Sequence, residues 1–72
     1  MRLEAFIDFI CGELSISSAR VNEYTPLGEV FRDETEAAEL ALALESEYGF
    51  DSDEELDPEM TVGELMEKLE EL

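Results

Sequence analysis

Three stretches of this sequence carry apolar residues at the spacing of an α-helix, and no stretch alternates as a β-strand does. The first stripe predicts a helix from about Arg2 to Leu14. The pattern as a whole predicts an all-α fold, a small bundle of three main helices plus short helical turns around one core. In chain order, the three stripes are Leu3, Phe6, Ile7, Ile10 and Leu14; Ala37, Leu40, Ala41, Leu44 and Tyr48; and Val62, Leu65, Met66, Leu69 and Leu72.

Helix-boundary signals frame the second and third stripes. Asp33 is the expected N-cap of the second helix, with Glu36 reaching back to complete a capping box. Gly49 supplies the left-handed residue that commonly ends a helix. Thr61 and Glu64 form another capping box, so the final helix is expected to begin there.

The connections between the helices have different compositions. Residues 15–24 form a serine-rich loop, and Thr25 follows it as the expected N-cap of a short helical turn over Leu27–Phe31. Residues 50–59 form an acidic loop, in which Pro58 prevents a long helix.

The length of the chain limits the function it can have. With 72 residues, we expect one domain over residues 1–72. A domain this small buries only about 60% of its unfolded surface, which leaves no room for a deep cleft walled by several loops. Histidine is absent, and the sequence shows no nucleophile–base pair and no metal cluster. We therefore expect no catalytic residues and no enzyme.

Negative charge dominates the composition, with 21 acidic and 4 basic residues and a net charge of −17. No lysine or arginine lies between Arg32 and Lys68. Such a surface repels nucleic acid and anionic lipid, and it favours the basic surface of a protein partner or cations. The alternative is that the charge only keeps a small protein in solution.

The single cysteine, Cys11, excludes an internal disulfide and fits a reducing cytoplasm. Cys11 flanks the first stripe and is expected to be a small buried hydrophobe. Phe9 projects away from that stripe, so it either packs under the following loop or is exposed for a partner. The N-terminal residues form no long apolar run, so we expect no signal peptide, no membrane span and a cytoplasmic monomer.

Several segments together carry a family resemblance. The second helix contains Glu39-Leu40-Ala41-Leu42-Ala43-Leu44-Glu45-Ser46-Glu47-Tyr48, and the last begins Thr61-Val62-Gly63-Glu64-Leu65. The first helix ends in Leu14-Ser15-Ile16, ahead of Val21. With the order of helices and loops, these residues resemble the acyl carrier protein family across nearly the whole chain. The resemblance implies that family's helical bundle.

The resemblance also implies where a carrier would hold its prosthetic group. In the family, the serine of an Asp-Ser-Leu triplet takes phosphopantetheine, whose thiol carries the acyl chain. Counting back from Glu39, the triplet falls on Asp33-Glu34-Thr35, with Glu34 at the serine position and Phe31 at an upstream glycine. A carboxylate cannot form the phosphodiester, which needs an alcohol, so no cofactor is expected. Glu34 instead places an anion at a helix N-terminus, where negative charge is favourable.

Two hydroxyls leave a genuine carrier, modified at an atypical residue, as an alternative. Thr35 lies one residue late for the triplet. Ser52 lies in Gly49-Phe50-Asp51-Ser52-Asp53, which is similar to Gly-x-Asp-Ser-Leu. A helix that began there would contain Pro58, and the chain would end before a last helix.

Small residues mark a further departure from the family pattern. Ala38 and Ala41 stand where family members usually carry valines that help to line an acyl tunnel. The smaller side chains either widen that space or let the helices pack closer together.

The acidic loop also contains a spacing that resembles a calcium loop. Asp51, Asp53 and Glu55 alternate as calcium ligands do, but Leu56 and Val62 occupy the positions that need glycine and an acid. We therefore expect a solvated acidic loop and no metal site.

The outward face of the second helix is the expected partner-binding surface. The resemblance implies docking onto basic patches of partner enzymes through Glu36, Glu39, Leu42 and Glu45. The alternative is an ordinary solvated helix face. We expect a noncatalytic interaction module linked to fatty acid, polyketide or peptide biosynthesis. A genuine carrier and an acidic adaptor or inhibitor of an unrelated basic protein are the alternatives.

Overall fold

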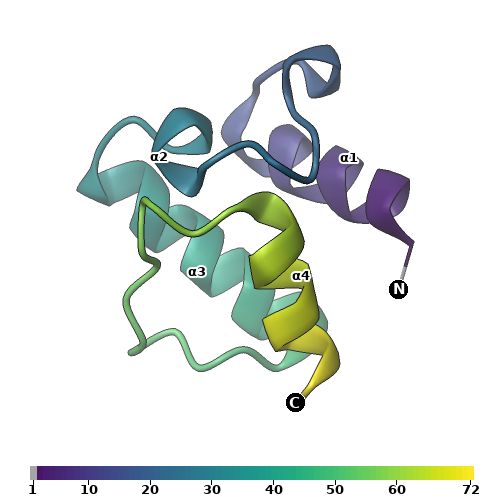
Figure 1. Ribbon diagram of the computed structural model, residues 1–72. Helices are drawn as coiled ribbons and strands as arrows, with labels where there is room; N and C mark the ends of the chain where they lie inside the picture. Colours follow the sequence, from purple (N-terminus) through teal and green to yellow (C-terminus); the bar gives the residue numbers. More distant parts are fainter. Residues whose placement is uncertain (1) are drawn as a thin grey trace.

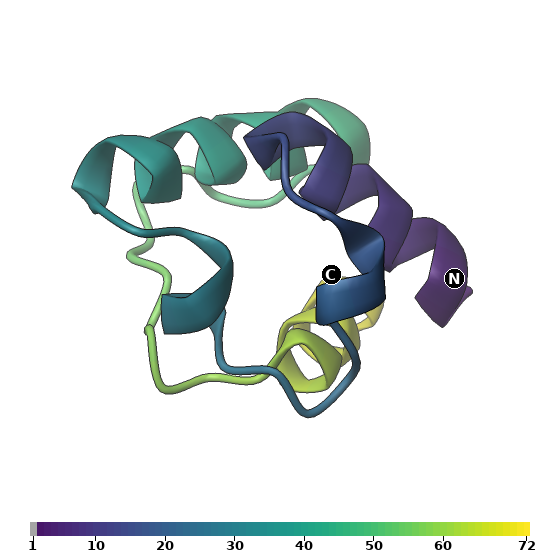
Figure 2. The ribbon, with the colours of Figure 1, turned by 90° about the horizontal axis from the view of Figure 1, so that it is seen from above.

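Three main helices and two short helical turns make up the described part of the chain, residues 2–72 of the computed structural model (Figure 1). This arrangement confirms the predicted all-α bundle, and within residues 2–72 there is no strand beyond one isolated bridge. The elements are α1 (Leu3–Leu14), η1 (Ser18–Arg20), α2 (Leu27–Val30), α3 (Glu34–Tyr48) and α4 (Val62–Glu70). Helix α1 packs against both α3 and α4, and Figure 2 shows it alongside α3.

The core consists of the inward faces of the helices together with anchors from the loops. The predicted stripes of α1 and α3 supply much of it, as expected from their spacing. Leu72 departs from the prediction, since it follows the end of α4 and is 68% exposed. The buried residues are Phe6, Ile7, Ile10, Cys11, Leu14, Val21, Leu27, Val30, Phe31, Leu40, Ala41, Leu44, Phe50, Val62, Leu65 and Leu69.

The structure decides the surroundings of two α1 side chains. Cys11 is buried, as predicted, and burial, with a smaller effect of the Asp8 carboxylate, raises the pKa of its thiol. A protonated thiol packs as a small hydrophobe. Phe9 packs against α3 and not under the following loop. Its ring lies edge-to-face on that of Tyr48, with 5.5 Å between the ring centroids.

The ends of α3 and the start of α4 follow the predicted caps, except that the Glu36 side chain accepts hydrogen bonds from a different residue than predicted. Gly49 ends α3 with φ of +74°, and the Thr61–Glu64 capping box is complete. At the start of α3, the Asp33 carboxylate accepts a hydrogen bond from the Glu36 backbone N–H. Glu36 does not reach back to Asp33, because its carboxylate accepts from the backbone N–H and the guanidinium of Arg32. The predicted capping box at Asp33 is therefore only half formed.

The N-cap of α2 is Pro26, and the prediction of Thr25 was wrong by one residue. The Thr25 hydroxyl is used elsewhere, because it accepts a hydrogen bond from the Asn22 backbone N–H. This contact stabilises the turn that precedes α2.

Two segments far apart in the sequence are joined by main-chain hydrogen bonds, which we call the backbone clasp. Leu27 N–H donates to the Met60 carbonyl and Gly28 N–H to the Pro58 carbonyl, at 2.8 and 2.9 Å. In return, Val62 N–H donates to the Thr25 carbonyl and Gly63 N–H to the Glu23 carbonyl, at 3.0 and 2.9 Å. The clasp needs glycine for close approach, since a Cβ at position 63 would lie 3.1 Å from the Glu23 carbonyl oxygen.

The clasp leads to a prediction about two glycines. Gly63→Ala should be roughly 1 kcal/mol less favourable for stability than a glycine-to-alanine change at an open helical position, because the added Cβ crowds the Glu23 carbonyl and weakens the hydrogen bond that it accepts. Gly12→Ala is the matched control, since nothing lies within 4 Å of a Cβ there. Gly12→Ala should raise stability by about 0.5–1 kcal/mol through helix propensity. Urea unfolding measures both, and an equal gain at the two positions would show that the clasp yields without cost.

Candidate functional site

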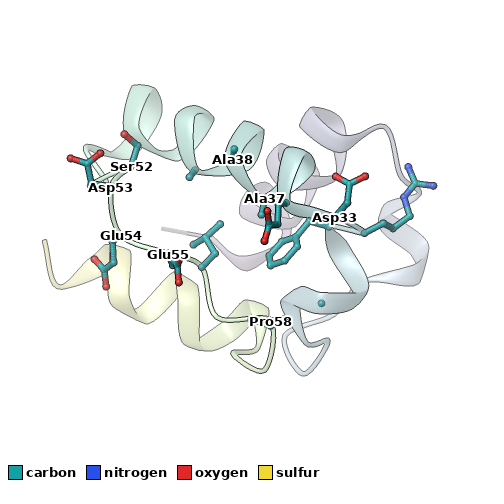
Figure 3. A pocket seen from close by; sticks show the side chains of 14 residues that line it. Asp33, Ala37, Ala38, Ser52, Asp53, Glu54, Glu55 and Pro58 are labelled. Carbon is teal, nitrogen blue, oxygen red and sulfur yellow. The ribbon is translucent and has the colours of Figure 1, made fainter.

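A groove lies between α3 and the acidic loop, and we call it the attachment groove because Glu34, which the sequence resemblance predicts to stand at the attachment position, lines it. Its volume is about 620 Å³. Asp33 lies at one end, Ser52 and Asp53 lie at the other, and Ala37 and Ala38 lie along α3 between them (Figure 3). The lining residues are Gly28, Phe31, Arg32, Asp33, Glu34, Ala37, Ala38, Ala41, Ser52, Asp53, Glu54, Glu55, Leu56 and Pro58.

The alanines of α3 open this groove. Ala37, Ala38 and Ala41 all line it. Small side chains here therefore leave open space between α3 and the acidic loop. Phe31, Leu56 and Pro58 add further apolar surface to the lining.

Glu34 is the first residue of α3, is exposed and lines the attachment groove. A helix start presents backbone N–H groups without helical partners, which favours a negative charge at this point. Thr35 is also exposed, but it does not line the groove, so its hydroxyl lies outside the groove that Glu34 lines.

Ser52 lies at the other end of the same groove. Its hydroxyl donates a hydrogen bond to the Glu45 carboxylate at 2.7 Å, and the side chain is half-buried. No helix follows Ser52 directly, because the next helix begins at Val62. Of the three positions considered for prosthetic-group attachment, Glu34 and Ser52 share one groove and Thr35 lies outside it, and of the two in the groove only Glu34 stands at the start of a helix.

The rim of the attachment groove is anionic. Its acids are Asp33, Glu34, Asp53, Glu54 and Glu55. The one basic lining residue, Arg32, forms an ion pair with Glu36 at 2.9 Å, and its hydrogen bonds lower the pKa of Glu36. Lys68 of α4 forms an ion pair with Glu54, which ties the acidic loop to α4.

The predicted docking residues do not form one face. Glu36 is turned toward Arg32, and its side chain is only 19% exposed. Glu45 contacts Ser52 on the groove side of α3. Glu39 and Leu42 remain on the outer surface, where Leu42 is 59% exposed. Glu39, Leu42 and Glu45 are exposed as expected, whereas Glu36 is partly buried against Arg32, and the role of these residues in partner binding stays a prediction.

A second depression lies between α1 and α3, and we call it the seam hollow. Its volume is about 480 Å³. The sequence predicted that Glu39 and Leu42 lie on the outer surface of α3, but not that α1 contributes to the same surface. The position of Phe9 outside the apolar stripe of α1 was the one indication of this contribution. The lining residues are Phe9, Glu13, Glu39, Leu42, Ala43, Ser46 and Glu47.

The calcium-like spacing does not build a metal cage. Asp51 uses a carboxylate oxygen to accept a hydrogen bond from the Asp53 backbone N–H, which closes a local turn. Residues 2–72 hold no group of three or more cysteine, aspartate or glutamate side chains arranged to hold a metal ion.

The chain has no match among protein-family models, curated proteins or solved structures. Among the helices of residues 2–72, none has the length and apolar character needed to cross a membrane.

Proposed function

We propose that this chain is an acyl-carrier-like protein without a phosphopantetheine group, acting as a noncatalytic, cytoplasmic interaction module for a basic protein surface. Its proposed setting is fatty acid, polyketide or peptide biosynthesis. The observation that carries the proposal is Leu42, a large apolar side chain that is 59% exposed on α3 beside the exposed Glu39. An apolar spot among acids is a usable recognition surface for a basic partner.

The attachment groove supports the absence of a prosthetic group. Glu34 occupies the start of α3 with a carboxylate, which has no hydroxyl to form a phosphodiester. The surrounding acids of the rim, Asp33 and Glu55 among them, would also repel the phosphate of an incoming phosphopantetheine.

The attachment chemistry can be restored in steps. The wild-type chain should gain no mass when incubated with a phosphopantetheinyl transferase and coenzyme A. Glu34→Ser should make it a weak substrate, because it places an alcohol at the start of α3. Adding Thr35→Leu and then Phe31→Gly should raise the modified fraction stepwise, and intact-protein mass spectrometry measures it.

Two controls define this experiment. Glu34→Ala removes the carboxylate without adding a hydroxyl, so it should remain unmodified. Circular dichroism must show folding at each step, since Phe31 is buried and its loss destabilises the core. A folded triple variant that is never modified would refute the alignment of Glu34 with the carrier serine.

A genuine carrier is the second candidate, and one contact favours it. The Ser52 hydroxyl donates to the Glu45 carboxylate, a group that can accept the serine proton while the serine oxygen attacks the pyrophosphate of coenzyme A. The P–O–P bond then breaks and adenosine 3′,5′-bisphosphate leaves. Modification of the wild type, mapped to Ser52 by peptide sequencing, would establish this candidate in place of the first. Ser52→Ala would then abolish the mass gain.

A further inference from the structure

The seam hollow combines apolar walls with an acidic margin. Phe9 comes from α1 and Leu42 and Ala43 come from α3, so the hollow lies across the seam between two helices. Phe9 is held in place by its edge-to-face contact with Tyr48. Leu42 remains 59% exposed, so its apolar surface is unburied in the isolated chain.

The carboxylates of the seam hollow are available to a partner. They belong to Glu13, Glu39 and Glu47. The ion pairs and side-chain hydrogen bonds of residues 2–72 involve none of these three groups. An incoming cation therefore need not displace an internal partner.

These features determine the chemistry of the occupant. The carboxylates would face each other across a contact between two copies of the chain, and like charges so placed are unfavourable. Anionic lipid is repelled in the same way. A basic protein helix fits instead, because an apolar side chain can enter while neighbouring lysines or arginines meet the carboxylates.

We propose that the seam hollow seats one bulky apolar side chain, such as leucine or phenylalanine, from a basic amphipathic helix of the partner. Lysine or arginine residues one turn before and after that side chain pair with Glu13, Glu39 and Glu47. This inference rests on the proposed function, since it names the surface and the chemistry by which the module recognises its partner. It also moves recognition away from the attachment groove, because no residue lines both depressions.

Synthetic peptides test this proposal. The probes are amphipathic helices with one leucine, phenylalanine or tryptophan flanked by lysines or arginines at three- and four-residue spacing. Titration into ¹⁵N-labelled protein should shift the amide resonances of Phe9, Glu13, Leu42 and Glu47. Those of Ser52 and Glu55, in the attachment groove, should stay in place. Peptides with alanine in place of the apolar residue, or glutamine in place of the basic ones, should bind more weakly.

Matched variants separate apolar from electrostatic recognition. Leu42→Ala should weaken binding about tenfold, as truncation of a central apolar contact does. Tyr24→Ala should leave binding unchanged, although Tyr24 is also a large exposed side chain, at 77%. Glu39→Gln with Glu47→Gln should weaken binding and reduce its salt dependence, whereas Glu29→Gln with Glu59→Gln removes the same charge and should have little effect.

The outcomes separate this inference from the proposed function. Peptide binding that shifts the attachment-groove resonances, or that is unaffected by Leu42→Ala, would overturn the seam hollow and leave the acidic interaction module standing. Binding of no basic peptide at any surface would overturn both. Seam-hollow shifts together with the loss caused by Leu42→Ala would support both.

Discussion

Phe50→Ala is expected to remove a large share of the free energy of unfolding of this protein. Phe50 is 2% exposed and follows the left-handed Gly49, so it carries the chain from α3 back into the core. Removing a buried phenylalanine costs about 3–5 kcal/mol. A domain of 72 residues has a total stability of about 4–11 kcal/mol at 0.05–0.15 kcal/mol per residue. One substitution therefore removes much of the available stability.

Tyr24→Ala is the control for this prediction. Tyr24 is 77% exposed, so its loss should change the free energy of unfolding by no more than about 0.5 kcal/mol. Urea unfolding followed by circular dichroism measures both variants. A Phe50→Ala protein that is as stable as the control would show that Phe50 is not part of the core.

Salt should raise the thermal stability substantially. The molecule measures 27 × 26 × 20 Å and carries a net charge of −17. At 0.01 M ionic strength the Debye length is about 30 Å, so charges across the whole molecule repel one another; at 1 M it is about 3 Å. Helical neighbours such as Glu4–Asp8 and Glu64–Glu67 each add about 0.2–0.5 kcal/mol of local repulsion. Screening should therefore raise Tm by about 5–10 °C, and magnesium or calcium should act at lower concentration.

Calorimetry across a sodium chloride series gives this result directly. The control is a variant with Glu4, Glu29 and Glu59 changed to glutamine, which should start from a higher Tm and respond less to salt. An identical response in the variant would mean that salt acts through general exclusion from the surface. A flat or falling Tm in the wild type would mean that the acids are already compensated within the fold.

The sequence predicted those parts of the fold that depend on local pattern. The apolar spacing of Leu40, Ala41 and Leu44 defines one buried face of α3, and Gly49 marks its end. These features involve residues within one or two helical turns, so neighbouring residues suffice to predict them. The Thr61 capping box is local in the same sense.

The parts that the sequence did not predict depend on competition between partners and on packing between helices. The Glu36 carboxylate could accept from the backbone N–H of Asp33, as the capping box predicts, or from that of Arg32. It accepts from Arg32, because the Arg32 guanidinium adds a second hydrogen bond there. Glu45 turns to Ser52, a contact across seven residues of chain. The seam hollow forms only because Phe9 of α1 and Leu42 of α3 line the same depression. Apolar periodicity within one helix does not predict which other helix packs beside it.

The backbone clasp has a consequence for the topology of the attachment groove. By joining Leu27 to Met60, it converts α3 and the acidic loop into a ring closed at its base. Extra residues inserted among 51–56 would enlarge that ring at little further entropic cost, because loop closure depends only weakly on length. We therefore expect such insertions to change the width of the groove while the hydrogen bonds of the clasp keep its base closed.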